Sequence, residues 1–237
     1  MKGVILAGGK GTRLLPLTNI TNKHLLPIYN KVMIEYPLNT LLKAGIKDIL
    51  IISGGDHIGG FVEYLGSGKK YHANFTYKTQ EEAGGTAQAL SLAEHFVGQD
   101  SIMVIMGDQI LEDDFSKALK TFKKGAKIFV KEVVNPERFS VAVLDGKSVI
   151  SIVEKPAKSP TPYALAGIFL YDPDIFKIIK NIKPSPRGEL EITDANIAYL
   201  KNRSLEAEII KGFWIDTGTF ETLSLAAKWA ENRNKKA

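Results

Sequence analysis

Short apolar segments alternate with helical patterns over the first half of the sequence, and this alternation limits the folds open to the chain. Val4–Ala7, Asp48–Ser53 and Ser101–Met106 are typical of buried strands, and Pro37–Ala44 and His57–Leu65 of helices. Two further segments continue the alternation, the strand Phe75–Lys78 and the helix Thr86–His95. Strands that are apolar on both faces belong to sheets covered by helices on both sides. The pattern therefore predicts an α/β fold with a Rossmann-like, mainly parallel sheet flanked by helices.

In the second half of the sequence, several expected strands follow one another without helices between them. Asp145-Gly146 is a hairpin turn signal between apolar runs, and the three prolines of 156–162 indicate a surface loop. The expected strands are Ile128–Glu132, Ser140–Leu144, Val149–Val153 and Ala164–Tyr171, and the expected helices are Asp174–Asn181, Glu191–Asn202 and Phe220–Asn232. We expect a small antiparallel part that completes one domain over residues 1–237. The boundary between the two parts of that domain falls near residue 110.

Composition excludes several classes of function. The chain has no cysteine, which excludes thiolate metal sites, cysteine nucleophiles and disulfide scaffolds. No apolar run reaches the roughly 18 residues of a membrane helix, so we expect a cytoplasmic protein without a membrane partner. The net charge of +5 is spread along the chain, which permits an anionic small substrate and argues against nucleic acid.

A glycine-rich segment, Gly8-Gly9-Lys10-Gly11-Thr12-Arg13, follows the first strand directly. Glycines let a backbone approach a ligand closely, and successive N–H groups form a nest for anions. The segment matches neither common phosphate motif: Leu14 stands where the dinucleotide fingerprint needs glycine, and Lys10 is followed by Gly11 rather than Ser or Thr. An ordinary tight turn is the alternative, and the nearby cations Arg13 and Lys23 favour a phosphate site.

These residues and several later motifs resemble the sugar-1-phosphate nucleotidylyltransferases. The matching segments are Leu6–Leu14, Pro16–Thr18, Asn22–Pro27, Tyr77–Gln80, Gly84–Ala89, Gly107-Asp108, Pro136–Phe139, Glu154–Pro156, Arg187–Asp194 and Asp216–Thr219. They cover nearly the whole chain in family order, and they are most similar to short members that use dTTP and glucose 1-phosphate. The resemblance implies the nucleotide-diphospho-sugar transferase fold and a reaction in which the sugar phosphate attacks the α-phosphorus and releases pyrophosphate. It also implies that residues 1–110 bind mainly the nucleotide and residues 111–237 mainly the sugar phosphate.

The resemblance also implies roles for individual residues. Arg13 would hold the leaving pyrophosphate, Lys23 would offset charge at the α-phosphorus, and Asp108 with Asp216 would bind Mg²⁺, which prefers one or two carboxylates plus phosphate oxygens. Asp108 and Asp216 could each instead be a turn or helix cap. The implied nucleotide-binding residues are Leu6, Gly8, Gly9, Gly11, Thr12, Arg13, Gln80, Gly84, Gly85 and Asp108. Arg13, Lys23 and Asp108 form the implied catalytic set.

The second substrate would be held by residues of the second half. Lys155 and Arg187 would bind the sugar phosphate and Glu154 the sugar hydroxyls, and the full set is Phe139, Ser140, Glu154, Lys155, Leu165 and Arg187. Ser140 stands where the family usually has glycine, so its hydroxyl either crowds the sugar or adds a hydrogen bond. Gln109 replaces the usual Asn, and His24 a common Gln.

Gln80 is the expected reader of the base. A Gln amide can donate to a carbonyl of thymine or uracil and accept from N3–H, with a further donor from the backbone of Gly84-Gly85. This favours dTTP or UTP without separating them, because one methyl contributes only about 1 kcal/mol.

Other readings stay open. They are a UTP-using or other-sugar enzyme and a non-catalytic nucleotide-sugar sensor. The apolar face of the last helix, with Leu223, Ala226, Ala227 and Ala230, suits either a core or the interface of a homo-oligomer. We do not expect the allosteric nucleotide-sugar site that longer family members build from additional C-terminal helices.

Overall fold

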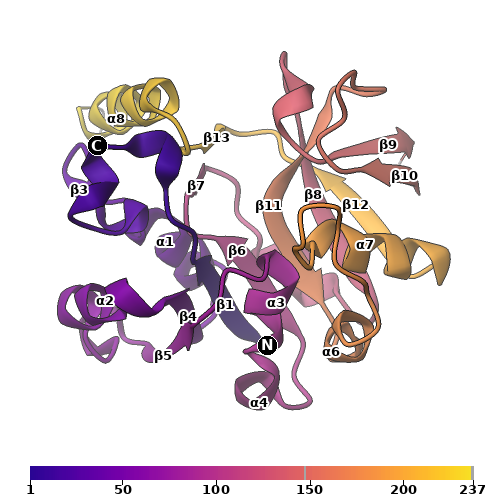
Figure 1. Ribbon diagram of the computed structural model, residues 1–237, viewed down its shortest axis with the longest axis horizontal. Coiled ribbons are helices and arrows are strands. Elements are labelled where there is room, and N and C mark those ends of the chain that lie inside the picture. Colours follow the sequence, from indigo (N-terminus) through magenta and orange to yellow (C-terminus); the bar gives the residue numbers. More distant parts are fainter. Residues whose placement is uncertain (147, 236–237) are drawn as a thin grey trace.

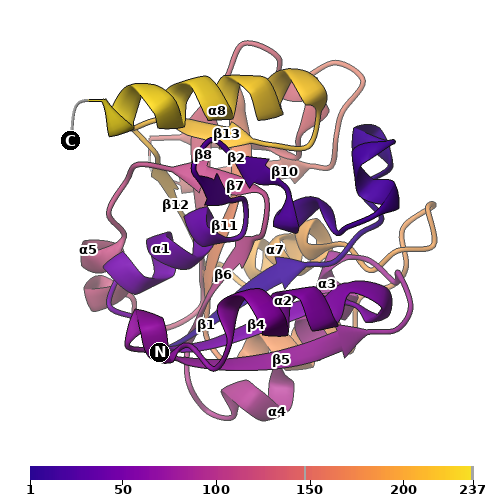
Figure 2. The same ribbon diagram turned by 90° about the vertical axis from the view of Figure 1, so that its left-hand side faces the viewer.

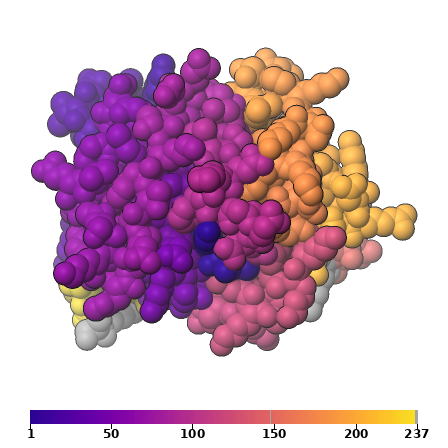
Figure 3. Space-filling view, turned by 90° about the horizontal axis from the view of Figure 1, so that it is seen from below, coloured from indigo at the N-terminus to yellow at the C-terminus, as the bar shows by residue number. Residues whose placement is uncertain are grey.

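A computed structural model describes residues 1–146 and 148–235 (Figure 1). One nine-stranded sheet runs through both halves of the chain, in the order β5-β4-β1-β6-β11-β8-β12-β10-β9. In the described residues no helix is long and apolar enough to cross a membrane. Seen from below, the early and late parts of the chain meet along a continuous surface (Figure 3).

The first four strands of the sheet are all parallel, as the apolar segments predict. They are β5 (Asn74–Gln80), β4 (Asp48–Gly54), β1 (Lys2–Ala7) and β6 (Ile102–Met106). Because the strands are parallel, the segments that follow β1, β5 and β6 all emerge at one edge of the sheet.

The second half adds mainly antiparallel strands, which confirms the expected antiparallel part. They are β11 (Tyr163–Tyr171), β8 (Ala126–Glu132), β12 (Leu205–Ile209), β10 (Ser148–Val153) and β9 (Val141–Asp145). Only β12 and β8 form a parallel pair among them. Strand β9 also pairs with β11 at Val141 and Ala164, so this half of the sheet curls back on itself.

Helices cover both faces of the sheet (Figures 1 and 2). The helices are α1 (Glu35–Lys43), α2 (Ile58–Leu65), α3 (Thr86–Ser91), α4 (Glu94–Val97), α5 (Ser116–Thr121), α6 (Asp174–Ile179), α7 (Ile192–Lys201) and α8 (Phe220–Asn234). Successive strand residues point to opposite faces: Val4 and Leu6 pack with α3, α6 and α7, and Ile5 and Ala7 with α1, α2 and α5.

Helix α8 returns to the beginning of the chain. Thr219 caps its N-terminus by accepting a hydrogen bond from the N–H of Thr222. Its face with Ala226 and Ala230 is buried against Leu14 and Ile28, with Leu223 and Ala227 beside them. The apolar face that suited either a core or an interface thus lies in the chain's own core.

Some elements differ from the sequence prediction. The helix expected over Thr86–His95 is interrupted, because the N–H groups of Leu92 and Ala93 bond three residues back and tighten the chain between α3 and α4. The prediction also missed β12, helix α5 and two small ribbons, β2 (Pro27–Ile28) with β3 (Lys31–Val32) and β7 (Gln109–Leu111) with β13 (Trp214–Asp216). The part of the chain that the structure describes also contains six single 3-10 turns: η1 (Thr12–Leu14), η2 (Leu17–Asn19), η3 (Lys23–Leu25), η4 (Gly55–His57), η5 (Lys69–Tyr71) and η6 (Pro136–Arg138).

Candidate active site

A cavity of about 760 Å³ opens where β1, β5 and β6 end. It is lined by most of the residues that the sequence singled out: Leu6, Gly8, Gly9, Thr12, Arg13, Lys23, Gln80, Gly85, Asp108, Phe139, Ser140, Glu154, Lys155, Leu165, Arg187 and Asp216. A second cavity of about 660 Å³, bordered by α6 and α7, contains none of them. The first cavity is therefore the candidate site.

Two predicted binding residues, Gly11 and Gly84, do not line the cavity but shape its rim. Gly11 has a φ of 61°, and a Cβ there would lie 2.8 Å from the side chain of Thr18. A Cβ at Gly84 would lie 2.9 Å from Cγ of Gln88. Both glycines leave room for a neighbouring side chain, so their contribution is to the shape of the loops.

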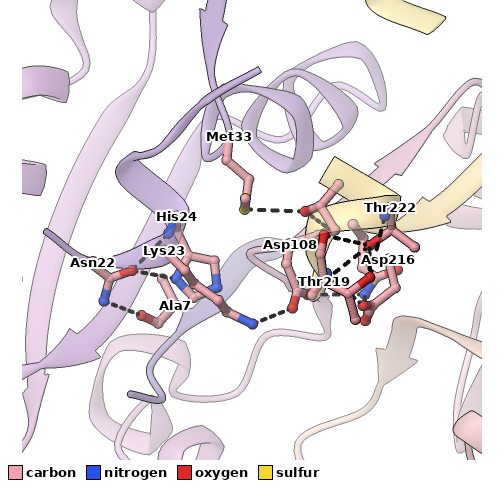
Figure 4. Close-up of polar contacts among 12 residues, drawn as sticks. Ala7, Asn22, Lys23, His24, Met33, Asp108, Asp216, Thr219 and Thr222 are labelled. Carbon is pink, nitrogen blue, oxygen red and sulfur yellow. Dashed lines mark hydrogen bonds and ion pairs between the residues drawn. The ribbon is translucent and has the colours of Figure 1, made fainter. Parts of the chain in front are cut away.

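Lys23, Asp108, Gln109 and Asp216 line the cavity and form a hydrogen-bonded network. Figure 4 shows Lys23, Asp108 and Asp216. Lys23 Nζ donates to Oδ2 of Asp108. The amide nitrogen of Gln109 bridges the two carboxylates, at 3.0 Å from Asp108 and 3.1 Å from Asp216. Gly167, at the irregularity in β11, makes room for Gln109, since a Cβ there would lie 3.1 Å from it. Thr217 follows β13, and both its N–H and its hydroxyl donate to the carbonyl of Asp108, which precedes β7.

The electrostatics of this pair suit a divalent cation. Burial alone would raise the pKa of Asp108, but the Lys23 ammonium holds it well below its usual range. Burial and the charge of Asp108 raise the pKa of Asp216. The described residues contain no cluster of three or more His, Cys, Asp or Glu side chains arranged for a metal. Two adjacent carboxylates beside an open cavity still fit Mg²⁺, which takes its other ligands from phosphates and water.

His24 is buried behind Lys23 as a neutral ring. Its pKa is lowered to about 3 by burial and by the charge of Lys23. Its Nδ1 lies 2.7 Å from Oδ1 of Asn22, an acceptor, so Nδ1 carries the proton. Asn22 in turn donates to the carbonyl of Ala7 at 3.3 Å (Figure 4). These bonds fix the Lys23 segment to the end of β1.

The hydrogen bonds of Gln80 fix the orientation of its side-chain amide. Its nitrogen donates to Oε1 of Gln88 at 2.7 Å and to the carbonyl of Gly85 at 3.3 Å. Its oxygen lies over Gly8, where a Cβ would come within 2.5 Å of it. The bidentate pairing expected for Gln80 thus lacks a free donor, because both N–H groups already have protein acceptors. Only the oxygen remains for a base.

In the part of the cavity that is lined by residues from the second half of the chain, the Glu154 carboxylate contacts several side chains. Its carboxylate accepts hydrogen bonds from Ser140 and from Thr193 (2.6 Å), and Arg187 lies 3.2 Å away. Burial alone would raise the pKa of Glu154, but the Ser140 and Thr193 bonds and the neighbouring cations hold it below its usual value. The Ser140 hydroxyl donates to the Glu154 carboxylate, so it is part of this cluster.

Three residues that the sequence did not single out complete the site. Trp214 packs edge-on against Phe139, with ring centroids 5.2 Å apart, and donates to the carbonyl of Ala166 at 3.0 Å. Thr193 lies inside a segment matched to the family, which was a usable signal. Gln88 also lies in a matched segment, but its contact with Gln80 has no sequence signature.

Comparisons with known proteins agree with this geometry. Residues 2–233 match the family model for nucleotidyl transferases. The chain is 42% identical over 238 residues to the glucose-1-phosphate thymidylyltransferase of Neisseria meningitidis, which covers 98% of this chain and 83% of the relative. It is 39% identical over 242 residues to the enzyme of that name from Mycobacterium tuberculosis, with 100% and 84% covered.

Solved structures have the same fold. A Bacillus anthracis protein, described as a candidate glucose-1-phosphate thymidylyltransferase in complex with sucrose, superimposes with a TM-score of 0.93 at 48% identity, covering 97% of this chain and 95% of that one. A UDP-glucose pyrophosphorylase has a TM-score of 0.88 at 24% identity and 98% coverage of both chains, which supports the fold alone. On the family match and these relatives, the chain belongs to the nucleotidyl transferase family.

Proposed function

We propose that the protein transfers the thymidylyl group of dTTP to glucose 1-phosphate, giving dTDP-glucose and pyrophosphate. The relatives at about 40% identity carry this activity in their names. The observation that carries the proposal is the division of one cavity between two sets of charged residues. Arg13, Lys23 and the Asp108–Asp216 pair form one set, and the Glu154 cluster with Lys155 and Arg187 forms the other.

The first set suits a triphosphate. The glycine loop after β1 brings backbone N–H groups to the cavity, and Gly9 and Gly11 have the positive φ values that such loops use. Arg13 holds the pyrophosphate that leaves, and Lys23 offsets charge that develops at the α-phosphorus. Mg²⁺ held by Asp108 and Asp216 would reduce the repulsion between the phosphate groups of the two substrates.

The second set suits a sugar phosphate. Arg187 donates to Glu191 at 2.7 Å and to Glu154 at 3.2 Å, so a substrate phosphate would compete for a cation that already has partners. Glu154 accepts from sugar hydroxyls, and Phe139 with Leu165 covers the apolar face of the ring.

The reaction needs no general base. A sugar phosphate oxygen is already ionised at neutral pH, and it attacks the α-phosphorus opposite the leaving pyrophosphate. The contribution of the chain is to align the two groups and to stabilise charge. This agrees with a buried neutral His24, whose ring hydrogen-bonds to the side-chain amide of Asn22.

The test is a pyrophosphate-release panel. We expect dTTP and UTP to react with glucose 1-phosphate at kcat/KM values within about tenfold of each other, and ATP and GTP to be poorer by about ten- to a hundredfold. Other sugar 1-phosphates test whether Ser140 changes the sugar preference. Equal efficiency with GTP and dTTP contradicts the proposal. Nucleotide-sugar binding without turnover would favour a sensor.

A further inference from the structure

The two ends of the Gln80 amide have different surroundings. Gln80 is 8% exposed and lies at the end of β5, where it lines the cavity with Gly8 and Gly85. Its nitrogen has two acceptors, Gln88 Oε1 and the Gly85 carbonyl. Its oxygen accepts no hydrogen bond from any described residue and lies over Gly8.

The acceptors decide which end is nitrogen. The backbone carbonyl of Gly85 can only accept, so a Gln80 turned by half a turn would bring two oxygens to about the same place. Gln88 adds the shorter bond, and its side chain reaches Gln80 because Gly84 has no Cβ in the way. The bond to Gly85 is long, at 3.3 Å, so the shorter bond to Gln88 is the stronger constraint on the orientation of the Gln80 amide.

We propose that Gln88 is a positioning residue that turns the Gln80 oxygen toward the base and makes the enzyme select thymine or uracil over cytosine. This rests on the proposed function, in which Gln80 contacts the base. An imide base has an N3–H that donates to the Gln80 oxygen. The N–H of Gly85 donates to no acceptor within the described residues and lines the same cavity, so it can serve an adjacent carbonyl of the base.

Cytosine shows why the orientation matters. A freely rotating Gln amide pairs with either base: with an imide through N3–H, or with cytosine by accepting from N4–H and donating to N3. When the nitrogen is held by Gln88, the second arrangement is lost and the cytosine N3 stays unpaired. An unpaired buried polar group reduces affinity by about tenfold or more.

The experiment measures kcat/KM for dTTP and CTP with saturating glucose 1-phosphate in wild type, Gln88→Met, Gln88→Glu, Gln80→Leu and Gln99→Leu. Met has nearly the length of Gln and lacks the acceptor, and Glu keeps an acceptor. Gln99, an exposed residue before β6, is the matched control. Melting temperatures and the affinities of dTDP and dCDP, measured by calorimetry, show whether each variant is folded and whether the effect is in binding.

We expect wild type to prefer dTTP over CTP by about thirtyfold or more. Gln88→Met should lower this ratio about tenfold, mainly by improving CTP, and Gln88→Glu should keep it. Gln99→Leu should behave as wild type. An unchanged ratio in Gln88→Met, or an equal fall in both Gln88 variants, overturns the role of Gln88.

Failure of the underlying function gives a different result. If wild type releases no pyrophosphate with dTTP and any sugar 1-phosphate, the proposed reaction is wrong, whatever the Gln88 variants bind. If wild type is active and Gln80→Leu retains the full dTTP preference, the reaction stands and both Gln80 and Gln88 lose their role in base selection.

Discussion

Arg13 lies directly against Gly218. A Cβ at position 218 would come within 2.8 Å of Nη2 of Arg13 and 2.7 Å of Oδ1 of Asp216, whose carboxylate accepts the N–H of Gly218 at 2.9 Å. The missing side chain thus lets Arg13, the proposed pyrophosphate-binding cation, and Asp216, the proposed metal ligand, lie close to each other in the cavity wall.

Gly218→Ala should therefore impair catalysis. Displacing Arg13 and Asp216 by about 1 Å should lower kcat at least tenfold, and the KM for glucose 1-phosphate should change less. Arg13→Ala should show the same division between kcat and KM. Steady-state kinetics with each substrate varied in turn measures this. Gly59→Ala is the control, because that exposed glycine in α2 has no neighbour within 4 Å of a new Cβ. An effect confined to the sugar-phosphate KM would reject the assignment of Arg13.

Activity should require a divalent ion, and Asp108→Asn should abolish most of it while the protein stays folded. Asp216→Asn should also remove activity, yet in EDTA it should raise the melting temperature by about 1–2 °C, because it removes one of two mutually repelling carboxylates. Pyrophosphate release measures the loss of activity, and scanning calorimetry with and without Mg²⁺ measures the melting temperature. Full turnover in excess chelator would exclude the metal role.

Glu154→Gln should affect the sugar substrate selectively. The carboxylate accepts from Ser140, Thr193 and Arg187, and an amide nitrogen in its place would face donors. We expect the KM for glucose 1-phosphate to rise about tenfold and the KM for dTTP to change by less than about twofold. Glu206→Gln, at an exposed ion pair on β12, is the matched control. Equal changes in both KM values would contradict a sugar-specific role.

Tyr199→Phe should lower stability without changing substrate preference. Its hydroxyl donates to buried Asp172 at 2.7 Å, and Asp172 also accepts the N–H of Gly125 at 2.7 Å. Removing one donor to a buried carboxylate costs about 1.5–3 kcal/mol, which is a fall of about 3–10 °C in melting temperature. Tyr163→Phe is the comparison, because its hydroxyl donates no hydrogen bond within the described residues. A melting temperature unchanged by Tyr199→Phe would show that the bond contributes nothing.

The sequence predicted the parallel half of the fold well because continuous apolar runs such as Asp48–Ser53 are a strong signal of buried strands. Most of the residues that line the cavity, Glu154 and Arg187 among them, were named through the family resemblance and not through the strand pattern. Strand β12 was missed although Leu205–Ile209 alternates apolar and acidic residues, because the segment is short, follows a helix closely and contains Glu and Ala, which are poor strand formers.

The pairings inside the site had no comparable signal. The bridge from Gln109 to Asp108 and Asp216 joins residues far apart in sequence, and so does the bond between Lys23 and Asp108. The direction of the Gln80 amide depends on Gln88 and a backbone carbonyl, which no residue pattern encodes. Such contacts follow from tertiary packing, so the residue list was predictable and their mutual orientation was not.

The most direct test of the proposed reaction follows oxygen atoms. Glucose 1-phosphate labelled with ¹⁸O at its three non-bridging phosphate oxygens is incubated with dTTP, Mg²⁺ and the enzyme. The masses of both products are then measured by mass spectrometry. Attack of the sugar phosphate on the α-phosphorus keeps all three labels in dTDP-glucose and leaves pyrophosphate unlabelled. Label in pyrophosphate, or an unlabelled nucleotide sugar, would contradict the account.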